Sequence, residues 1–132
     1  MRRGLYLLCA GIGIAGLALS IHLAYISSLP YCPPQLSECD VVVTSEYAYF
    51  YGVSVALLGA IWFAVAITLS ITSYLSTRFG RIFLGWCIIG MLGVAYLVYV
   101  EAVLLHAICI YCTFAHVLGA VLTALSVIAL KR

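Results

Sequence analysis

Residues 102–130 read AVLLHAICIYCTFAHVLGAVLTALSVIAL and contain no Asp, Glu, Lys or Arg. A charge-free run of this length exceeds the roughly 20 apolar residues with which a helix crosses a bilayer. Three further charge-free runs precede it, at residues 4–37, 47–77 and 82–100. The sequence therefore predicts an all-α membrane protein with four transmembrane helices.

The composition of the whole chain supports a lipid environment. Of its 132 residues, 67% are hydrophobic and 8% are charged, whereas a soluble domain has about 45–50% and about 25%. Six Lys and Arg against four Asp and Glu give a formal net charge of +2, which is too little positive charge for a nucleic-acid-binding protein. We expect one membrane domain over residues 1–132 and no nucleic-acid partner.

The charged residues between the apolar runs set the expected helix boundaries. We expect helices at about residues 5–28, 53–75, 82–105 and 107–130, with one long loop at residues 29–52. The first apolar stretch exceeds the roughly 7–15 residues of a signal-peptide core, so we interpret it as a retained helix. The other two connections are short and make neighbouring helices antiparallel. The prediction is an up-down-up-down bundle.

All six cations fall on one side of this predicted bundle. They are Arg2 and Arg3 before the first helix, Arg78 and Arg81 between the second and third, and Lys131 and Arg132 after the fourth. By the positive-inside rule this side is cytoplasmic. We therefore expect a multi-pass cell-membrane protein with cytoplasmic termini and an extracytoplasmic loop at residues 29–52.

The six cysteines separate by position in this topology. The four expected on the outer side are Cys32 and Cys39 in the loop and Cys109 and Cys112 at the start of the last helix. Structural disulfides are the ordinary use of cysteines in an oxidising compartment. Cys9 and Cys87 lie in the inner half of their helices, where we expect them to pack as small hydrophobic residues.

The spacing of the outer cysteines favours redox chemistry over purely structural disulfides. Cys109-Ile110-Tyr111-Cys112 is a CxxC at a helix N-terminus, where unpaired amides and the helix dipole stabilise a thiolate. A disulfide across two intervening residues is also tight and easier to reduce. Pro33 and Pro34 favour an extended conformation at Cys32, which a thioredoxin-like partner could pair with. Prolines also serve as ordinary turn residues.

The histidines near the CxxC allow more than one interpretation. A metal site would use the set His106, Cys109, Cys112 and His116. Four ligands from one straight helix cannot enclose a tetrahedral ion, so we expect no metal. His116 lies one turn beyond Cys112 and would project beside a molecule that touches this sulfur, or it would form a helix–helix hydrogen bond. The roles of His22 and His106 stay open.

Several motifs together resemble the vitamin K epoxide reductase family. They are the two loop cysteines, the run Cys39-Asp40-Val41-Val42-Val43-Thr44-Ser45, the Tyr51-Gly52 pair before the second helix, and the CxxC at residues 109–112. The resemblance covers nearly the whole chain and is to a microbial homologue without a fused thioredoxin-like domain. It implies a four-helix bundle around a quinone and a function like that of the bacterial DsbB oxidases.

The resemblance also implies a role for each site residue. Cys112 would contact the quinone, of the menaquinone, ubiquinone or vitamin K type, and Cys109 would be its resolving partner. Cys39 would pass electrons to Cys109, and Cys32 would exchange with an outer thioredoxin-like (DsbA-like) protein. Ser45 would match the family's loop serine beside the redox centre.

Two positions depart from the animal enzymes of this family. Where they have a tyrosine four residues beyond the CxxC, this chain has His116, which could also donate a hydrogen bond to a quinone. Where they align an asparagine that binds the other carbonyl, this chain has Ala48, which cannot form that bond. His116 is therefore the expected quinone-binding side chain beside Cys112.

Two other classes of protein share this length and helix count. A small proton-coupled four-helix transporter would use Glu101, because an intramembrane carboxylate commonly marks a transport site. Such a transporter would not need four outer cysteines. A purely structural tetra-spanning protein would explain stable disulfides but not a CxxC at the start of a helix. A thiol–disulfide oxidoreductase is therefore favoured, with the transporter as the alternative.

Overall fold

The computed structural model describes residues 2–28, 49–50, 53–104 and 110–131. The long helices are α1 (Arg2–Ser28), α3 (Val55–Leu75), α4 (Gly80–Tyr99) and α5 (Ile110–Lys131). All four belong to segments that are long and apolar enough to cross a membrane. The all-α, four-helix membrane fold expected from the sequence is confirmed.

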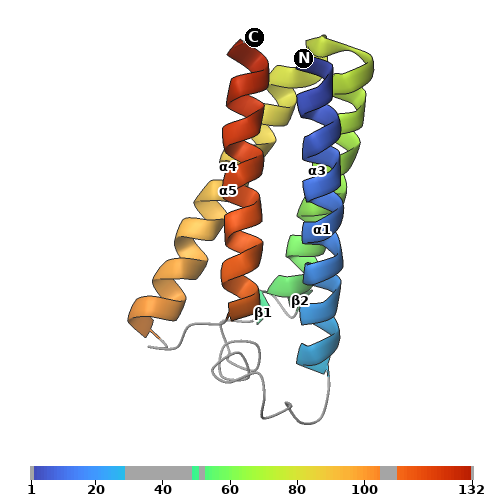
Figure 1. Ribbon diagram of the computed structural model, residues 1–132. Coiled ribbons are helices and arrows are strands. Elements are labelled where there is room, and N and C mark those ends of the chain that lie inside the picture. The colour runs from blue at the N-terminus through green and yellow to red at the C-terminus, as the bar shows by residue number, and fades with distance from the viewer. Residues whose placement is uncertain (1, 29–48, 51–52, 105–109, 132) are drawn as a thin grey trace.

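The four helices form a ring in which each helix packs against two neighbours. α1 lies against α3 and α5, and α4 packs against the same two helices. Both termini and the α3–α4 connection lie at one end of the bundle (Figure 1). This arrangement is the up-down-up-down order. It gathers the described basic residues at that end, which we call the basic end: Arg2, Arg3, Arg78, Arg81 and Lys131.

Two short segments with other helical geometries flank α4. A 3-10 turn, η3 (Thr77–Phe79), joins α3 to α4, so α4 begins at Gly80, slightly before the expected start at residue 82. At its other end α4 continues into η4 (Val100–Leu104), a π-helical segment. A π-helical turn changes the direction in which side chains leave a helix, and such turns are frequent at functional sites.

A short β ladder precedes α3. Strand β1 (Tyr49–Phe50) pairs antiparallel with β2 (Val53–Ser54), with Tyr49 opposite Ser54. The sequence pattern predicted a loop over residues 29–52 and a helix from residue 53, and this ladder was not foreseen. Aromatic and β-branched residues favour extended pairing, and α3 therefore begins only at Val55.

The buried core lies in the middle of the bundle and towards the basic end. It contains residues from all four helices: Tyr6, Cys9, Phe63, Ala66, Phe83, Cys87, Leu122 and Ala129. The rings of Tyr6 and Phe83 meet edge to face, with centroids 6.2 Å apart. Cys9 and Cys87 are fully buried free thiols, in agreement with the packing role expected for them.

Glycines allow α1 and α3 to approach each other closely. A Cβ atom on Gly16 would collide with the ring of Phe63, and one on Gly13 would lie 2.7 Å from the side chain of Ile67. Helices in lipid associate through van der Waals contact over small residues rather than through a hydrophobic driving force. The glycines are therefore part of what holds α1 against α3.

Two tryptophans connect α3 to α4. The Trp62 Nε1–H donates to the carbonyl oxygen of Trp86 at 3.3 Å, and the Trp86 Nε1–H donates to the carbonyl oxygen of Trp62 at 3.1 Å. The two rings are stacked, with centroids 6.4 Å apart and planes 14° apart. This reciprocal pair sets the axial position of α4 relative to α3.

We predict that Gly16→Ala lowers the stability of the bundle and that Gly11→Ala does not. The added methyl group at residue 16 would collide with the buried Phe63 ring, and overpacking of this kind costs about 1–3 kcal/mol. A methyl group added at Gly11 would meet nothing within 4 Å, so this residue is the matched control on the same helix. Thermal unfolding of the two purified variants in detergent tests this, and equal melting temperatures would contradict the packing role of Gly16.

Candidate functional site

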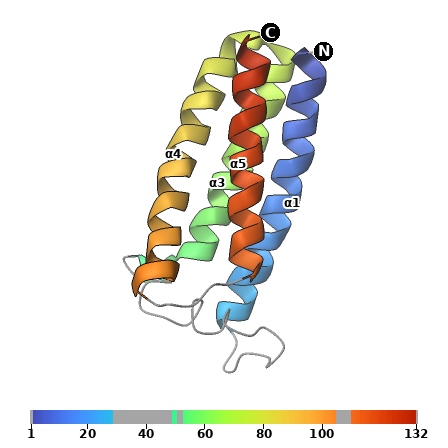
Figure 2. The same ribbon diagram turned by 60° about the vertical axis from the view of Figure 1, so that its left-hand side comes forward.

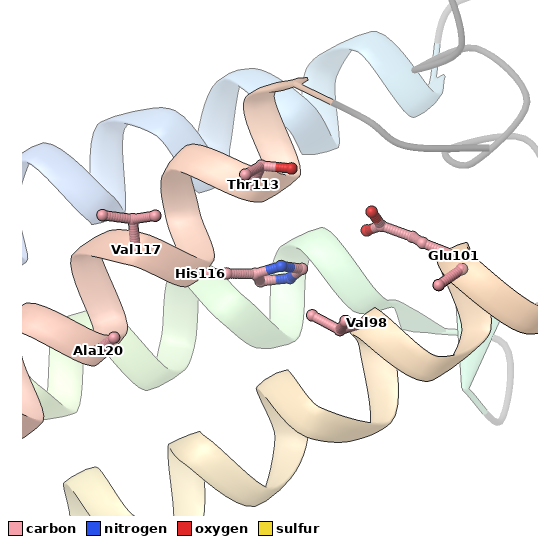
Figure 3. Close-up of a pocket in the computed structure, with 7 residues that line it drawn as sticks. Val98, Glu101, Thr113, His116, Val117 and Ala120 are labelled. Carbon is pink, nitrogen blue, oxygen red and sulfur yellow. The ribbon is translucent and has the colours of Figure 1, made fainter.

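A cavity of about 340 Å³ lies between α4 and α5, in the half of the bundle away from the basic end. Its lining consists of Val98, Glu101 and Ala102 on one side and Thr113, His116, Val117 and Ala120 on the other (Figure 3). Small-molecule sites are typically clefts of roughly 300–1,000 Å³ with apolar walls and a few polar groups. This cavity is open on one side, its lining is mostly apolar, and its volume falls at the lower end of what such sites have.

Glu101 reaches the cavity from the α4 side. It belongs to the π-helical segment η4, and only 6% of its surface is exposed. Figure 3 shows its carboxylate directed towards α5. A carboxyl group buried in a membrane-spanning segment is energetically costly, and its presence there indicates a functional site. The sequence alone pointed to Glu101 only as a possible transport residue and did not connect it with quinone chemistry.

His116 reaches the cavity from α5. Its ring extends from that helix towards α4, so that it and Glu101 approach the same space from opposite walls (Figure 3). Cys112 lies four residues earlier in α5 and is half-buried. Residues at this spacing lie on one face of a helix, about 6 Å apart along its axis. Cys112 is not among the lining residues, but it lies one turn from a residue that is.

The remaining predicted site residues lie outside the described residues: Cys32, Cys39, Ser45 and Cys109, together with His106 and Ala48. Their roles therefore stay predictions. Within the described ranges, no group of three or more His, Cys, Asp or Glu side chains could hold a metal ion. The site that the structure brings together is therefore Glu101 and His116 across a largely aliphatic cavity.

The rest of the cavity lining was not predicted from the sequence. On α5, residues Thr113, His116, Val117 and Ala120 follow one another at helical spacings, so this wall could have been derived from His116 alone. The opposite wall could not have been derived in this way. It includes the π-helical segment, where the regular α-helical spacing of side chains is interrupted.

A ring contact joins α1 to the first turn of α5. The His22 ring meets the Tyr111 ring edge to face, with centroids 5.6 Å apart and planes at 73°. Tyr111 is one of the two residues between the cysteines of the CxxC. This contact, which was not foreseen from the sequence, connects the first turn of α5 to α1.

The fold defines a membrane protein with four helices that can cross a bilayer and an open cavity between two of them. The model of the vitamin K epoxide reductase family matches residues 6–127, a range that includes the whole cavity lining and every residue of the buried core except Ala129. The chain belongs to this family, and membership indicates redox activity on disulfides and quinones within a membrane. Comparison with curated proteins gave no significant match.

Proposed function

We propose that this protein is a quinone-dependent thiol–disulfide oxidoreductase of the cell membrane. It passes electrons from an extracytoplasmic thioredoxin-like (DsbA-like) protein to a membrane quinone and so promotes disulfide formation. The observation that carries this proposal is the cavity between α4 and α5, whose lining residue His116 lies one turn from Cys112. Family membership supports the same class of chemistry.

The residues around the cavity fit a quinone ring. Such a ring is flat and apolar and has two carbonyl oxygens that accept hydrogen bonds. Val98 and Val117 supply apolar walls, while His116 and Thr113 supply side chains that can donate. The volume of about 340 Å³ lies at the lower end of the usual range for ligand sites, roughly 300–1,000 Å³. This volume is suited to a quinone head group, whose isoprenoid tail would extend into lipid.

The sulfur chemistry follows from thiolate exchange. A bound quinone accepts two electrons and two protons. Cys112 presents the thiolate to the ring, and Cys109 joins it in a disulfide as the electrons leave. Cys39 then attacks this disulfide at Cys109, and the resulting Cys32–Cys39 disulfide oxidises the outer dithiol protein. Each exchange proceeds through a mixed disulfide, and the reduction potentials set its direction. Ser45 would lie beside the redox centre.

The charge distribution supports the orientation that this route needs. The described basic residues gather at the end of the bundle that holds both termini. We infer that the basic end faces the cytoplasm by the positive-inside rule. The start of α5, with Cys112 in its first turn, then faces the outer side, where secreted proteins acquire disulfides.

A proton-coupled transporter is a second candidate because Glu101 is buried beside the cavity. This function would use the carboxyl group but would leave the CxxC without a role. Transport would also continue after replacement of the cysteines, whereas the redox route would stop. Cysteine variants therefore separate the two candidates.

We predict that replacing Cys32, Cys39, Cys109 or Cys112 by Ala abolishes quinone reduction, because each sulfur carries a step of the route. Cys9→Ala and Cys87→Ala are the controls, since both thiols are buried in the core. The measurement is the absorbance change of a short-chain quinone when the reduced outer partner is added to purified protein. A loss of turnover in a correctly folded Cys9 or Cys87 variant would be inconsistent with this division of the cysteines.

We further predict that Cys39→Ser accumulates a covalent adduct with a thioredoxin-like protein. In this variant the Cys32 thiolate attacks the disulfide of the oxidised thioredoxin-like protein, which breaks the partner's S–S bond and forms a Cys32–partner mixed disulfide that no Cys39 thiol can displace. Non-reducing electrophoresis followed by mass spectrometry identifies the cysteine in the adduct, and the double variant Cys32→Ser/Cys39→Ser is the control that should form none. An adduct through Cys109 instead would reverse the proposed order of exchange.

His116→Phe should raise the KM for quinone about 2- to 12-fold, since a buried hydrogen bond contributes about 0.5–1.5 kcal/mol. His22→Phe is the matched control, because His22 lies outside the cavity lining and a phenyl ring can keep the contact with Tyr111. Thiol exchange at Cys32 should be unchanged in both variants. A lowered melting temperature with an unchanged KM in His116→Phe would instead assign this residue to helix packing.

A further inference from the structure

The proton balance of the proposed reaction requires a donor besides the cysteines. Reduction of a quinone to a quinol takes two electrons and two protons, and the Cys109/Cys112 pair supplies both electrons when it forms a disulfide. Because Cys112 reacts as a thiolate, the pair brings only one proton, on the thiol of Cys109. The second proton must come from another group, and the hydrocarbon region of a membrane holds no bulk water to provide it.

Glu101 is the described residue best placed to provide this proton. It lines the cavity and is 6% exposed. Its carboxylate points into the space that the His116 ring approaches from the other wall (Figure 3). The two carbonyl oxygens of a 1,4-quinone lie on opposite edges of its ring. A ring held between α4 and α5 can therefore direct one oxygen to His116 and the other to Glu101.

The described parts of the helices next to α4 contain few other groups that could exchange protons with Glu101. α3, which packs against α4, contains no Asp, Glu, Lys or Arg between Val55 and Leu75. On α5, the charged residue Lys131 lies at the basic end, far from the cavity. Of the titratable side chains of α5, His116 lines the cavity, whereas Tyr111 and Cys112 lie in the first turn of the helix. Within the described residues, Glu101 is thus the acid of this site.

We propose that Glu101 is a catalytic proton donor to the quinone, an inference that rests on the proposed function. In this step the S–H bond of Cys109 and the O–H bond of Glu101 break, and two O–H bonds form on the quinol. The S–S bond between Cys109 and Cys112 forms as two electrons pass from sulfur to the ring. Glu101 is left as a carboxylate and takes up a proton from the aqueous side before the next turnover.

The test uses Glu101→Gln, which keeps the size and hydrogen-bonding capacity of the side chain but removes its transferable proton. General acid catalysis contributes about 10²–10⁴-fold, so the kcat for reduction of a short-chain ubiquinone should fall about 100-fold or more. The KM should stay within about twofold of wild type. Thiol exchange between Cys32 and the reduced outer partner should be unchanged, because it precedes the proton transfer.

Two further variants separate proton donation from a role in the fold. Glu101→Asp retains the acid and should keep a kcat well above that of Glu101→Gln. Glu101→Ala leaves space for a small weak acid, so added formate should restore quinone reduction in this variant but not accelerate wild type. Melting temperatures of all three variants measure the structural contribution of the side chain independently of turnover.

The results of these measurements distinguish failure of Glu101 as the proton donor from failure of the proposed function. A wild-type kcat in Glu101→Gln would overturn Glu101 as the donor while leaving the proposed function intact. A fall in melting temperature and kcat together, without rescue by formate, would assign Glu101 to the fold and overturn the proposal as well. Failure of the wild-type protein to reduce quinone with its reduced partner would instead overturn the proposed function itself.

Discussion

Helices in lipid gain little by burying apolar surface against one another, because the lipid tails are equally apolar. In this bundle, close van der Waals contact and hydrogen bonds to backbone carbonyls hold the helices together instead. The Phe63 ring packs directly over Gly16 between α3 and α1. Ser70 Oγ donates to the carbonyl oxygen of Tyr6, which connects the same two helices. These contacts fix α1 against α3, and the reciprocal Trp62–Trp86 hydrogen bonds fix α3 against α4. The rest of the structure depends on such contacts, because they set the position of each helix.

The position of the cavity follows from where such contacts occur. Between α4 and α5, Thr123 Oγ1 lies 3.5 Å from the carbonyl oxygen of Cys87, in the core of the bundle. Beyond this point the two helices diverge away from the basic end, as Figures 1 and 2 both show. The cavity lies in this region, between Val98 and Ala120. The same packing that joins the helices at one end therefore leaves room for a ligand towards the other.

The sequence was most informative where regular helical periodicity applies. The charge-free runs predicted the four helices, and the spacing from Cys112 predicted the face of His116. Periodicity could not predict the π-helical segment that carries Glu101, because that segment depends on which backbone hydrogen bonds form within the folded bundle. The β1–β2 ladder was missed for a similar reason, since strand pairing is set by contact between backbones. The loop cysteines and Ser45 lie outside the described residues, so their assignment rests on the sequence and the family.

Glu101 and His116 can reach the same ligand only if α4 keeps its axial position relative to the other helices. The electrons and one proton of the proposed reaction arrive from the cysteines of the CxxC, whereas the second proton comes from Glu101 on the α4 side. The animal enzymes of the family use an asparagine where this chain has Ala48, so here a carboxyl from a helix would supply the second polar contact to the ring. One helical turn corresponds to about 5.4 Å, and a slip of α4 by that distance would carry Glu101 out of reach of a ring held by His116. The Trp62–Trp86 pair, through its reciprocal hydrogen bonds, fixes α4 against α3. These tryptophans lie far from Glu101 along α4, yet their hydrogen bonds to α3 help to set the height of the proposed proton donor in the bundle.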